Sequence, residues 1–265
     1  MQKYLMDNCM IPRHEKILKL LAGKENVLVS ELSKLLDVSE ATIRTDLNSL
    51  SKQGKVDRLH GGAHLVEERV RQEYSFQIRQ SLNSQKKQKI GVLASQFVDS
   101  LDSVLFDAST TVLAMAHSLR KREELKDVTV IPTGIWTAIE LMGCSNINVL
   151  LPGGYLRHTS GSITGLPTSD FFNGLILQKA FLGAWGISFE NGLTDTHLLE
   201  IELKKFIVSR AKKVFILVDG NKFRQTGLSA YAKINQITTV ITDTSAPMEE
   251  IVKMRKANIE VLIAT

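Results

Sequence analysis

The sequence is poor in cysteine and proline and contains no long hydrophobic run. Its 265 residues include 2 cysteines and 5 prolines. Cys9 and Cys144 lie far apart, and His60 and His64 are separated by two glycines that disfavour a shared helix, so neither a disulfide scaffold nor a metal site is expected. No run approaches the roughly 18 apolar residues of a membrane span, and the N-terminus lacks the apolar stretch of a signal peptide. We therefore expect a cytoplasmic protein with reduced thiols and no membrane partner.

Two nucleotide-binding signatures are also absent. The chain has no G-x-G-x-x-G fingerprint and no G-x-x-x-x-G-K-[ST] loop, which argues against a dinucleotide or a nucleoside triphosphate, and we expect no cofactor. Hydrophobic residues make up 43% of the chain, which is enough for a folded protein with one large and one small domain.

The excess positive charge lies at one end of the chain. Residues 1–65 hold 10 basic and 8 acidic residues, residues 66–89 hold 6 and 3, and residues 90–265 hold 17 of each. This asymmetry is typical of a nucleic-acid-binding head joined to a neutral body.

Three short helices are expected near the N-terminus. Apolar residues at helical spacings predict helices over 13–21 and 31–37, the second with Ser30 as its N-cap. A third helix is expected to start at the N-cap Ser39 and to end at Gly54. Its inward-facing residues are Ile43, Leu47 and Leu50. After it, alternating apolar residues and a Gly-Gly turn predict a two-stranded wing.

Together these elements predict a winged helix-turn-helix whose third helix enters the major groove of DNA. On its outward face, Arg44 would contact guanine or a phosphate and Asn48 adenine. Arg58 and His60, near the wing tip, would touch phosphate or the minor groove. The plainer alternative is a helical packing domain with solvated charges. The candidate DNA-contacting residues are Ser39, Glu40, Thr42, Arg44, Thr45, Asn48, Arg58 and His60.

Beyond residue 90, short apolar runs alternate with helical patterns. They predict buried, mostly parallel strands in an α/β sheet, where ligands bind at the carboxyl ends of the strands. The residues at those ends suit a small anionic, hydroxylated ligand such as a sugar phosphate, although each alone could be an ordinary turn or helix cap. The candidate ligand-binding residues are Asp107, Ser109, Thr110, Thr111, Gly153, Gly154, Arg157, Gly183, Trp185, Asp195, Glu200 and Lys222.

The fold class expected is therefore α/β, with a small winged helix-turn-helix domain ahead of a larger, mostly parallel α/β domain. We expect a DNA-binding domain over 1–65, a polar connector containing helix over 66–89, and a ligand-sensing effector domain over 90–265.

The segment SEATIRTDLNSLSKQGKVDRLHGGA (39–63) resembles the signature of the DeoR family of bacterial transcription regulators. The resemblance continues through DASTT, GGYLR, QKAFLGAWGI, GLTD, EIELKK, DGNKF and ITD, and covers nearly the whole chain. The chain departs from the family at Thr45, where a second basic residue is common, and at Ser109, where glycine is usual. It also departs at Gln178 and at Pro132 and Thr133.

The resemblance implies a repressor of a carbohydrate-metabolism operon, whose operator binding is modulated by a phosphorylated sugar and which forms a homodimer or homotetramer. It also implies a fold similar to ribose-5-phosphate isomerase, so the alternative is an isomerase-like enzyme fused to a DNA-binding domain. The acidic pair of that enzyme stands here as Leu182 and Trp185, and its lysine position falls at or near Asp195. Since the proton transfer needs those charges, we expect no catalytic residue, and Glu200 is expected to bind hydroxyls.

Overall fold

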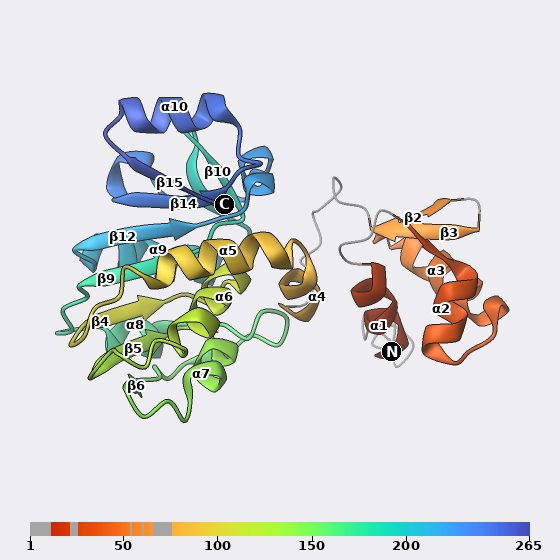
Figure 1. Cartoon of the computed structure of the whole chain (residues 1–265), viewed down its shortest axis with the longest axis horizontal. Coiled ribbons are helices and arrows are strands. Elements are labelled where there is room, and N and C mark those ends of the chain that lie inside the picture. Colours follow the sequence, from red (N-terminus) through yellow and green to blue (C-terminus); the bar gives the residue numbers. More distant parts are fainter. Residues whose placement is uncertain (1–11, 22–25, 54, 60, 66–75) are drawn as a thin grey trace. The chain divides into compact units, whose positions relative to one another are not determined.

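The computed structural model describes residues 12–21, 26–53, 55–59, 61–65 and 76–265 (Figure 1). The chain divides into two compact units, Met1–Ser84 and Gln85–Thr265. The connector expected over 66–89 is thus shared between the units, and its residues 66–75 lie outside the described part. The limits of the functional domains stay a prediction.

The first unit is a helical domain with a small antiparallel sheet. Its strands pair in the order β1-β3-β2, so a third strand joins the expected two-stranded wing. Its elements are α1 (Pro12–Leu21), β1 (Val27–Leu28), α2 (Val29–Leu36), α3 (Glu40–Lys52), β2 (Val56–Leu59), β3 (Gly62–Leu65) and α4 (Phe76–Ser81).

One apolar core holds this unit together. Ile43, Leu47 and Leu50 of α3 are fully buried in it, as the helical spacing predicts. The prediction for the start of α2 was wrong, because the helix begins one residue before Ser30 and Ser30 is exposed. The Glu31 carboxylate instead accepts a hydrogen bond from the backbone N–H of Leu28 (3.2 Å) and covers that end of the helix. The expected stop of α3 at Gly54 lies outside the described residues.

The second unit is built on a seven-stranded, fully parallel sheet in the order β15-β14-β12-β9-β4-β5-β6. The predicted α/β class is therefore confirmed. The strands are β4 (Ser103–Phe106), β5 (Val128–Pro132), β6 (Ile147–Val149), β9 (Lys179–Leu182), β12 (Lys213–Leu217), β14 (Thr239–Asp243) and β15 (Glu260–Ala264).

Helices cover both faces of this sheet (Figure 1). Alternate strand residues belong to two separate cores, as Leu105 and Phe106 of β4 illustrate. Helices α5 (Ser84–Ser95), α6 (Thr110–Leu119) and α7 (Ile135–Leu141) pack into the core of Phe106. Helices α9 (Leu198–Arg210) and α10 (Met248–Lys256) pack into the core of Leu105. Burial on both faces explains the continuous apolar strand sequences.

Smaller elements connect the strands of the parallel sheet. They include two short antiparallel sheets, of order β10-β11-β13 and β7-β8. The elements are β7 (Tyr155–Leu156), β8 (Ile163–Thr164), α8 (Leu166–Phe171), β10 (Gly186–Ser188), β11 (Gly192–Asp195), the 3₁₀ turns η1 (Gly220–Arg224) and η2 (Ile234–Gln236), and β13 (Ser229–Ala232).

Candidate functional site

Helix α3 presents a polar face beside its buried one. Ser39 caps the helix, with its Oγ accepting from the backbone N–H of Thr42 at 3.1 Å, as the sequence predicts. Arg44, Thr45 and Asn48 are exposed, and Glu40 and Thr42 are half-buried. Six of the eight candidate DNA-contacting residues therefore share one face or end of a single helix.

The side chains on this face already contact one another. The Arg44 guanidinium lies 2.6 Å from Glu40 Oε2. Arg58 of β2 donates through Nη1 to Asn48 Oδ1 at 2.5 Å, and so lies against α3 instead of reaching from the wing tip as the sequence suggested. His60 lies outside the described residues.

A buried carboxylate that sequence analysis missed fixes α3 against α1. Asp46 accepts hydrogen bonds from Arg13 Nη2 at 2.9 Å and pairs with His14 Nε2 at 3.1 Å. Burial alone would raise the pKa of Asp46, but the hydrogen bonds and charges of Arg13 and His14 together outweigh burial and lower it. The sequence feature that could have revealed this contact is the charged Asp46 at an inward-facing position of α3, next to Leu47.

In the second unit the strand order reverses between β4 and β9, since β5 and β6 follow β4 on one side and β12, β14 and β15 follow β9 on the other. Ligands of parallel α/β sheets bind at such a switch point, beyond the carboxyl ends of the strands. Asp107 follows β4 and Gly183 follows β9, and the Gly183 N–H donates to Asp107 Oδ2 at 2.8 Å. The structure thus brings two predicted site residues together at this point.

A buried lysine on α9 links three strand ends. Lys204 Nζ lies 2.7 Å from Asp195 Oδ2 and 3.2 Å from Asp107 Oδ2, and it donates to the Gly183 carbonyl oxygen at 3.0 Å. Tyr231 donates to the same carbonyl oxygen at 2.9 Å. Burial alone would lower the pKa of Lys204, but the charges of Asp195 and Asp107 raise it well above its ordinary value. The lysine is therefore a fixed cation.

Sequence analysis missed both Lys204 and Tyr231. Lys204 falls three residues after Ile201 and three before Ile207, so the helical spacing already places it on the buried face of α9. Burial raises the pKa of Tyr231, which keeps its hydroxyl protonated as a donor.

Helix α6 begins directly after Asp107 and is capped by Ser109, whose Oγ accepts from the Val112 N–H at 3.1 Å. Ser109 stands where the family favours glycine, and its side chain thus hydrogen-bonds to the helix that it begins. The first backbone N–H groups of the helix, at Thr110 and Thr111, have no partner within it and carry its positive dipole end. Both threonines are buried at the switch point.

Arg157 and Glu200 form an ion pair beside the β7-β8 hairpin. Glu200 Oε1 also accepts from Ser162 Oγ at 2.6 Å and from Ser160 Oγ at 3.2 Å. Burial alone would raise the pKa of Glu200, but the charges of Lys204 and Arg157 and the Ser162 hydrogen bond lower it. Because Arg157 is already neutralised by Glu200, it is a weaker candidate for binding an anion than the sequence suggested.

The remaining predicted residues lie on neighbouring loops. Lys222 Nζ, on η1, lies 5.2 Å from the centre of the Trp185 ring and 3.2 Å from Gln225 Oε1. Gly153 and Gly154 are exposed, and a Cβ at Gly154 would lie 2.1 Å from Thr168 Oγ1. Gly154 therefore permits close packing, a Cβ at Gly153 would meet nothing within 4 Å, and neither residue contributes a side chain to a ligand.

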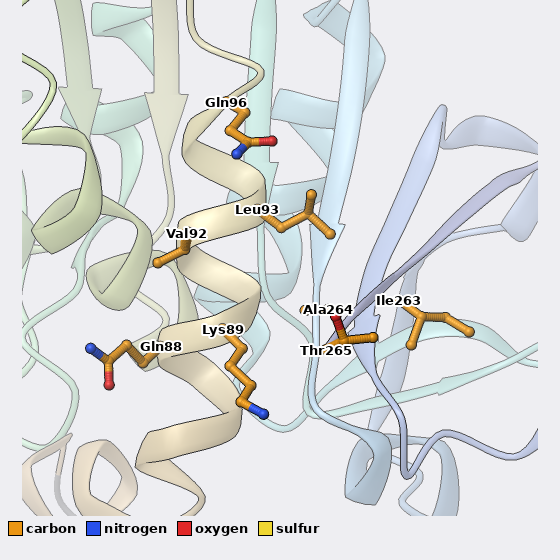
Figure 2. Close-up of a pocket in the computed structure, with 8 residues that line it drawn as sticks. All are labelled: Gln88, Lys89, Val92, Leu93, Gln96, Ile263, Ala264 and Thr265. Atoms are coloured by element: carbon orange, nitrogen blue, oxygen red, sulfur yellow. The ribbon is translucent and has the colours of Figure 1, made fainter.

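A cavity of about 380 Å³ lies elsewhere, between α5 and the end of β15 (Figure 2). Leu93 and Lys89 project from α5 toward Ala264 and Thr265 in this view. None of the predicted ligand-binding residues lines it. The charged groups and the first amides of α6 converge instead at the strand ends.

The described residues hold neither a metal-type cluster nor a helix of membrane-spanning character. In this part of the chain no group of three or more His, Cys, Asp or Glu side chains is placed to hold a metal ion. The helices found among these residues are too short or too polar to span a bilayer.

Comparisons with known proteins match both units. The family described as DeoR-like helix-turn-helix domain matches residues 13–69, and the DeoR C terminal sensor domain matches residues 82–244. The HTH-type transcriptional regulator GolR of Listeria innocua is 33% identical over 252 residues, which cover 95% of this chain and 98% of GolR. The glycerol-3-phosphate regulon repressor of Escherichia coli is 30% identical over 236 residues, which cover 89% of this chain and 92% of the repressor.

Two solved structures show a weak similarity to the chain. Ribose 5-phosphate isomerase A of Methanocaldococcus jannaschii is 19% identical with a TM-score of 0.40, covering 53% of this chain and 54% of the isomerase. The full-length sorbitol operon regulator SorC of Klebsiella pneumoniae is 13% identical with a TM-score of 0.40, covering 93% of this chain and 99% of SorC.

Proposed function

The chain belongs to the DeoR family of transcriptional regulators, and from that premise we propose that it represses a carbohydrate-metabolism operon until a phosphorylated sugar binds its second unit. It is a DNA-binding regulator and not an enzyme, since relatives that match it over nearly their whole length are transcriptional regulators. The alternative of an isomerase-like enzyme is therefore abandoned. As a regulator of transcription, the protein is proposed to act in the cytoplasm.

The DNA contacts are proposed to come from α3 and β2. Ser39 at the start of α3 and the exposed face that follows it enter the major groove, while the apolar face stays in the core. Arg44 supplies the main base or phosphate contact once its guanidinium releases Glu40 and binds DNA. Glu40, Thr42, Thr45, Asn48 and Arg58 complete the proposed interface.

The DNA interface is tested by selecting duplexes from a random library with the full chain. We expect the wild-type protein to yield a consensus and Arg44→Ala to yield none. Lys19→Met, which removes an exposed cation from α1, serves as the matched control. An unchanged consensus for Arg44→Ala overturns the assignment of α3.

The effector is proposed to bind at the switch point between β4 and β9. One observation carries this proposal, namely the convergence there of the α6 N-terminus, a cation-stabilised carboxylate cluster and hydroxyl side chains. Phosphate is the usual guest of unbonded amides at a helix start. We place it at Thr110 and Thr111, with Lys222 as the neutralising cation on the neighbouring loop.

The carboxylates of Asp107 and Asp195 supply hydrogen-bond acceptors to the proposed site. Asp107 and Asp195 outnumber the one lysine between them, so this cluster repels an anion and accepts from sugar hydroxyls. The name of the glycerol-3-phosphate regulon repressor and that of the putative aga operon repressor of Escherichia coli O157:H7 are consistent with a small phosphorylated polyol or sugar.

Ligand binding is proposed to shift the chain between two arrangements with different operator affinity. Helix-turn-helix regulators bind paired half-sites, so we propose a homodimer or a homotetramer as the active form.

A thermal-shift screen of the full chain tests the effector. Each phosphorylated sugar is paired with its unphosphorylated counterpart. We expect a rise in Tm with one or more of the phosphorylated compounds, because a ligand that binds the native state stabilises it. Stabilisation by an unphosphorylated sugar with none from its phosphate ester overturns the phosphate assignment.

A further inference from the structure

Arg58 lies on the face of α3 that is proposed to read DNA. Its Nη1 atom donates to Asn48 Oδ1 at 2.5 Å and to the carbonyl oxygen of Arg44 at 3.3 Å. Arg44 and Asn48 are four residues apart, so the guanidinium lies across one turn of the helix. Arg58 is half-buried there, and its Nε atom is enclosed by protein. The side chain is thus held at the helix, away from the tip of the wing.

This contact determines which end of the Asn48 amide faces Arg58. A guanidinium has only donors, so the amide must turn its oxygen toward Arg58 and its NH₂ group away. Readout of adenine by one asparagine uses both the oxygen and the NH₂ group on the same base. With Oδ1 directed to Arg58, Asn48 offers the groove two N–H donors. The remaining guanidinium N–H groups of Arg58 are also donors.

We propose that Arg58 and Asn48 form one base-reading pair that recognises guanine, in which Arg58 orients the Asn48 amide as a hydrogen-bond donor. In the major groove guanine presents two adjacent acceptors, N7 and O6, whereas adenine presents an acceptor beside a donor. A surface of donors with one positive charge therefore matches guanine and leaves the adenine amino group without an acceptor. The pair also ties β2 to α3, so the wing strand takes part in base recognition.

The inference rests on the proposed role of α3, and selection from a random duplex library tests both. The full chain is compared as wild type, Asn48→Ala, Arg58→Ala and the double variant. We expect a guanine in the wild-type half-site at which both single variants lose discrimination by roughly 5- to 150-fold. The double variant should lose no more guanine discrimination than the more strongly affected single variant, because the two side chains act as a unit.

Arg58→Lys separates base reading from charge. Lysine keeps the positive charge but lacks the rigid fork of donors, so we expect the guanine preference to weaken while the salt dependence of binding stays the same. This variant also replaces Arg58→Ala if the alanine variant proves unfolded by urea titration. Lys19→Met on α1 is the control and should keep the wild-type consensus.

Each contrary result of the duplex selection overturns a different part of the proposal. Loss of preference at two different base pairs overturns the pairing of Arg58 with Asn48. An adenine at the shared position overturns the donor orientation of the amide. An unchanged consensus with affinity lowered equally for all duplexes makes Arg58 a phosphate contact only. If Arg44→Ala also leaves the consensus unchanged, the role of α3 itself is wrong.

Discussion

Lys204 Nζ lies 2.7 Å from Asp195 Oδ2, and this contact joins α9 to the end of β11. The same ammonium group lies 3.2 Å from Asp107, which follows β4. One cation between two carboxylates leaves a net negative charge at the floor of the proposed site. Hydroxyl groups of a ligand are therefore favoured over an anionic group against this floor.

Replacing Lys204 by methionine should destabilise the second unit strongly. The change keeps the length of the side chain but leaves Asp107 and Asp195 buried without their cation, which typically costs about 3–5 kcal/mol. Urea unfolding of the full chain measures the loss. Lys205→Met is the matched control, since Lys205 is the next residue of α9 and is exposed. Equal stability of the two variants would contradict the role given to Lys204.

Ser109 and Gly183 are expected to be coupled through space. A Cβ added at Gly183 would lie 2.5 Å from Ser109 Cβ, so Gly183→Ala should destabilise the protein by about 1–3 kcal/mol. Ser109→Gly removes the colliding atoms and should recover most of that loss in the double variant. Ser109→Ala keeps Cβ and should not rescue. Unfolding free energies of the wild type, the three single variants and the two double variants test this, and rescue by Ser109→Ala would show that the clash is not the cause.

Elements with regular apolar patterns could be predicted from the sequence alone. The alternation of buried strands and amphipathic helices gave the α/β class, and the spacing of Ile43, Leu47 and Leu50 gave the inward face of α3. The Ser39 cap followed from local chemistry, because the bond from Ser39 to Thr42 spans three residues. Such features depend on interactions between residues that are close in sequence.

Contacts between distant segments could not be predicted in the same way. Lys204 and Asp107 lie 97 positions apart in the sequence, and their pairing depends on the strand order at the switch point. The Arg58 contact with Asn48 depends on how β2 lies along α3. The start of α2 was misplaced because Glu31 caps it from within the helix, which makes a capping serine unnecessary.

The first unit should lose stability in acid through Asp46. The folded pKa of Asp46 is lowered, so its stabilising contribution is present above the unfolded pKa of about 4 and is lost as pH falls through the folded pKa. Asp46→Asn should cost about 1.5–3 kcal/mol at neutral pH, and the difference from wild type should shrink between about pH 5 and pH 2.

Hydrogen exchange of the α3 backbone amides, followed against pH, measures this difference within the first unit. Asp37→Asn is the control, since Asp37 is an exposed residue at the end of α2. If the difference in stability between the wild type and Asp46→Asn stays constant on acidification, the Asp46 charge does not stabilise the contact with α1.

Lys222 should bind the phosphate group of the effector. Its ammonium group lies on the face of Trp185 and on the loop after β12, at the same edge of the parallel sheet as the start of α6, and we expect it to donate a charge-assisted hydrogen bond to a phosphate there. Lys222→Met should weaken binding of the phosphorylated sugar found in the thermal-shift screen by roughly 10- to 100-fold. Fluorescence of Trp185 reports the titration, with Trp136→Phe as the background that removes the other tryptophan. Lys233→Met, at an exposed lysine before η2, is the control. If both lysine variants weaken binding equally, the effect is long-range electrostatics, and Lys222 does not contact the phosphate.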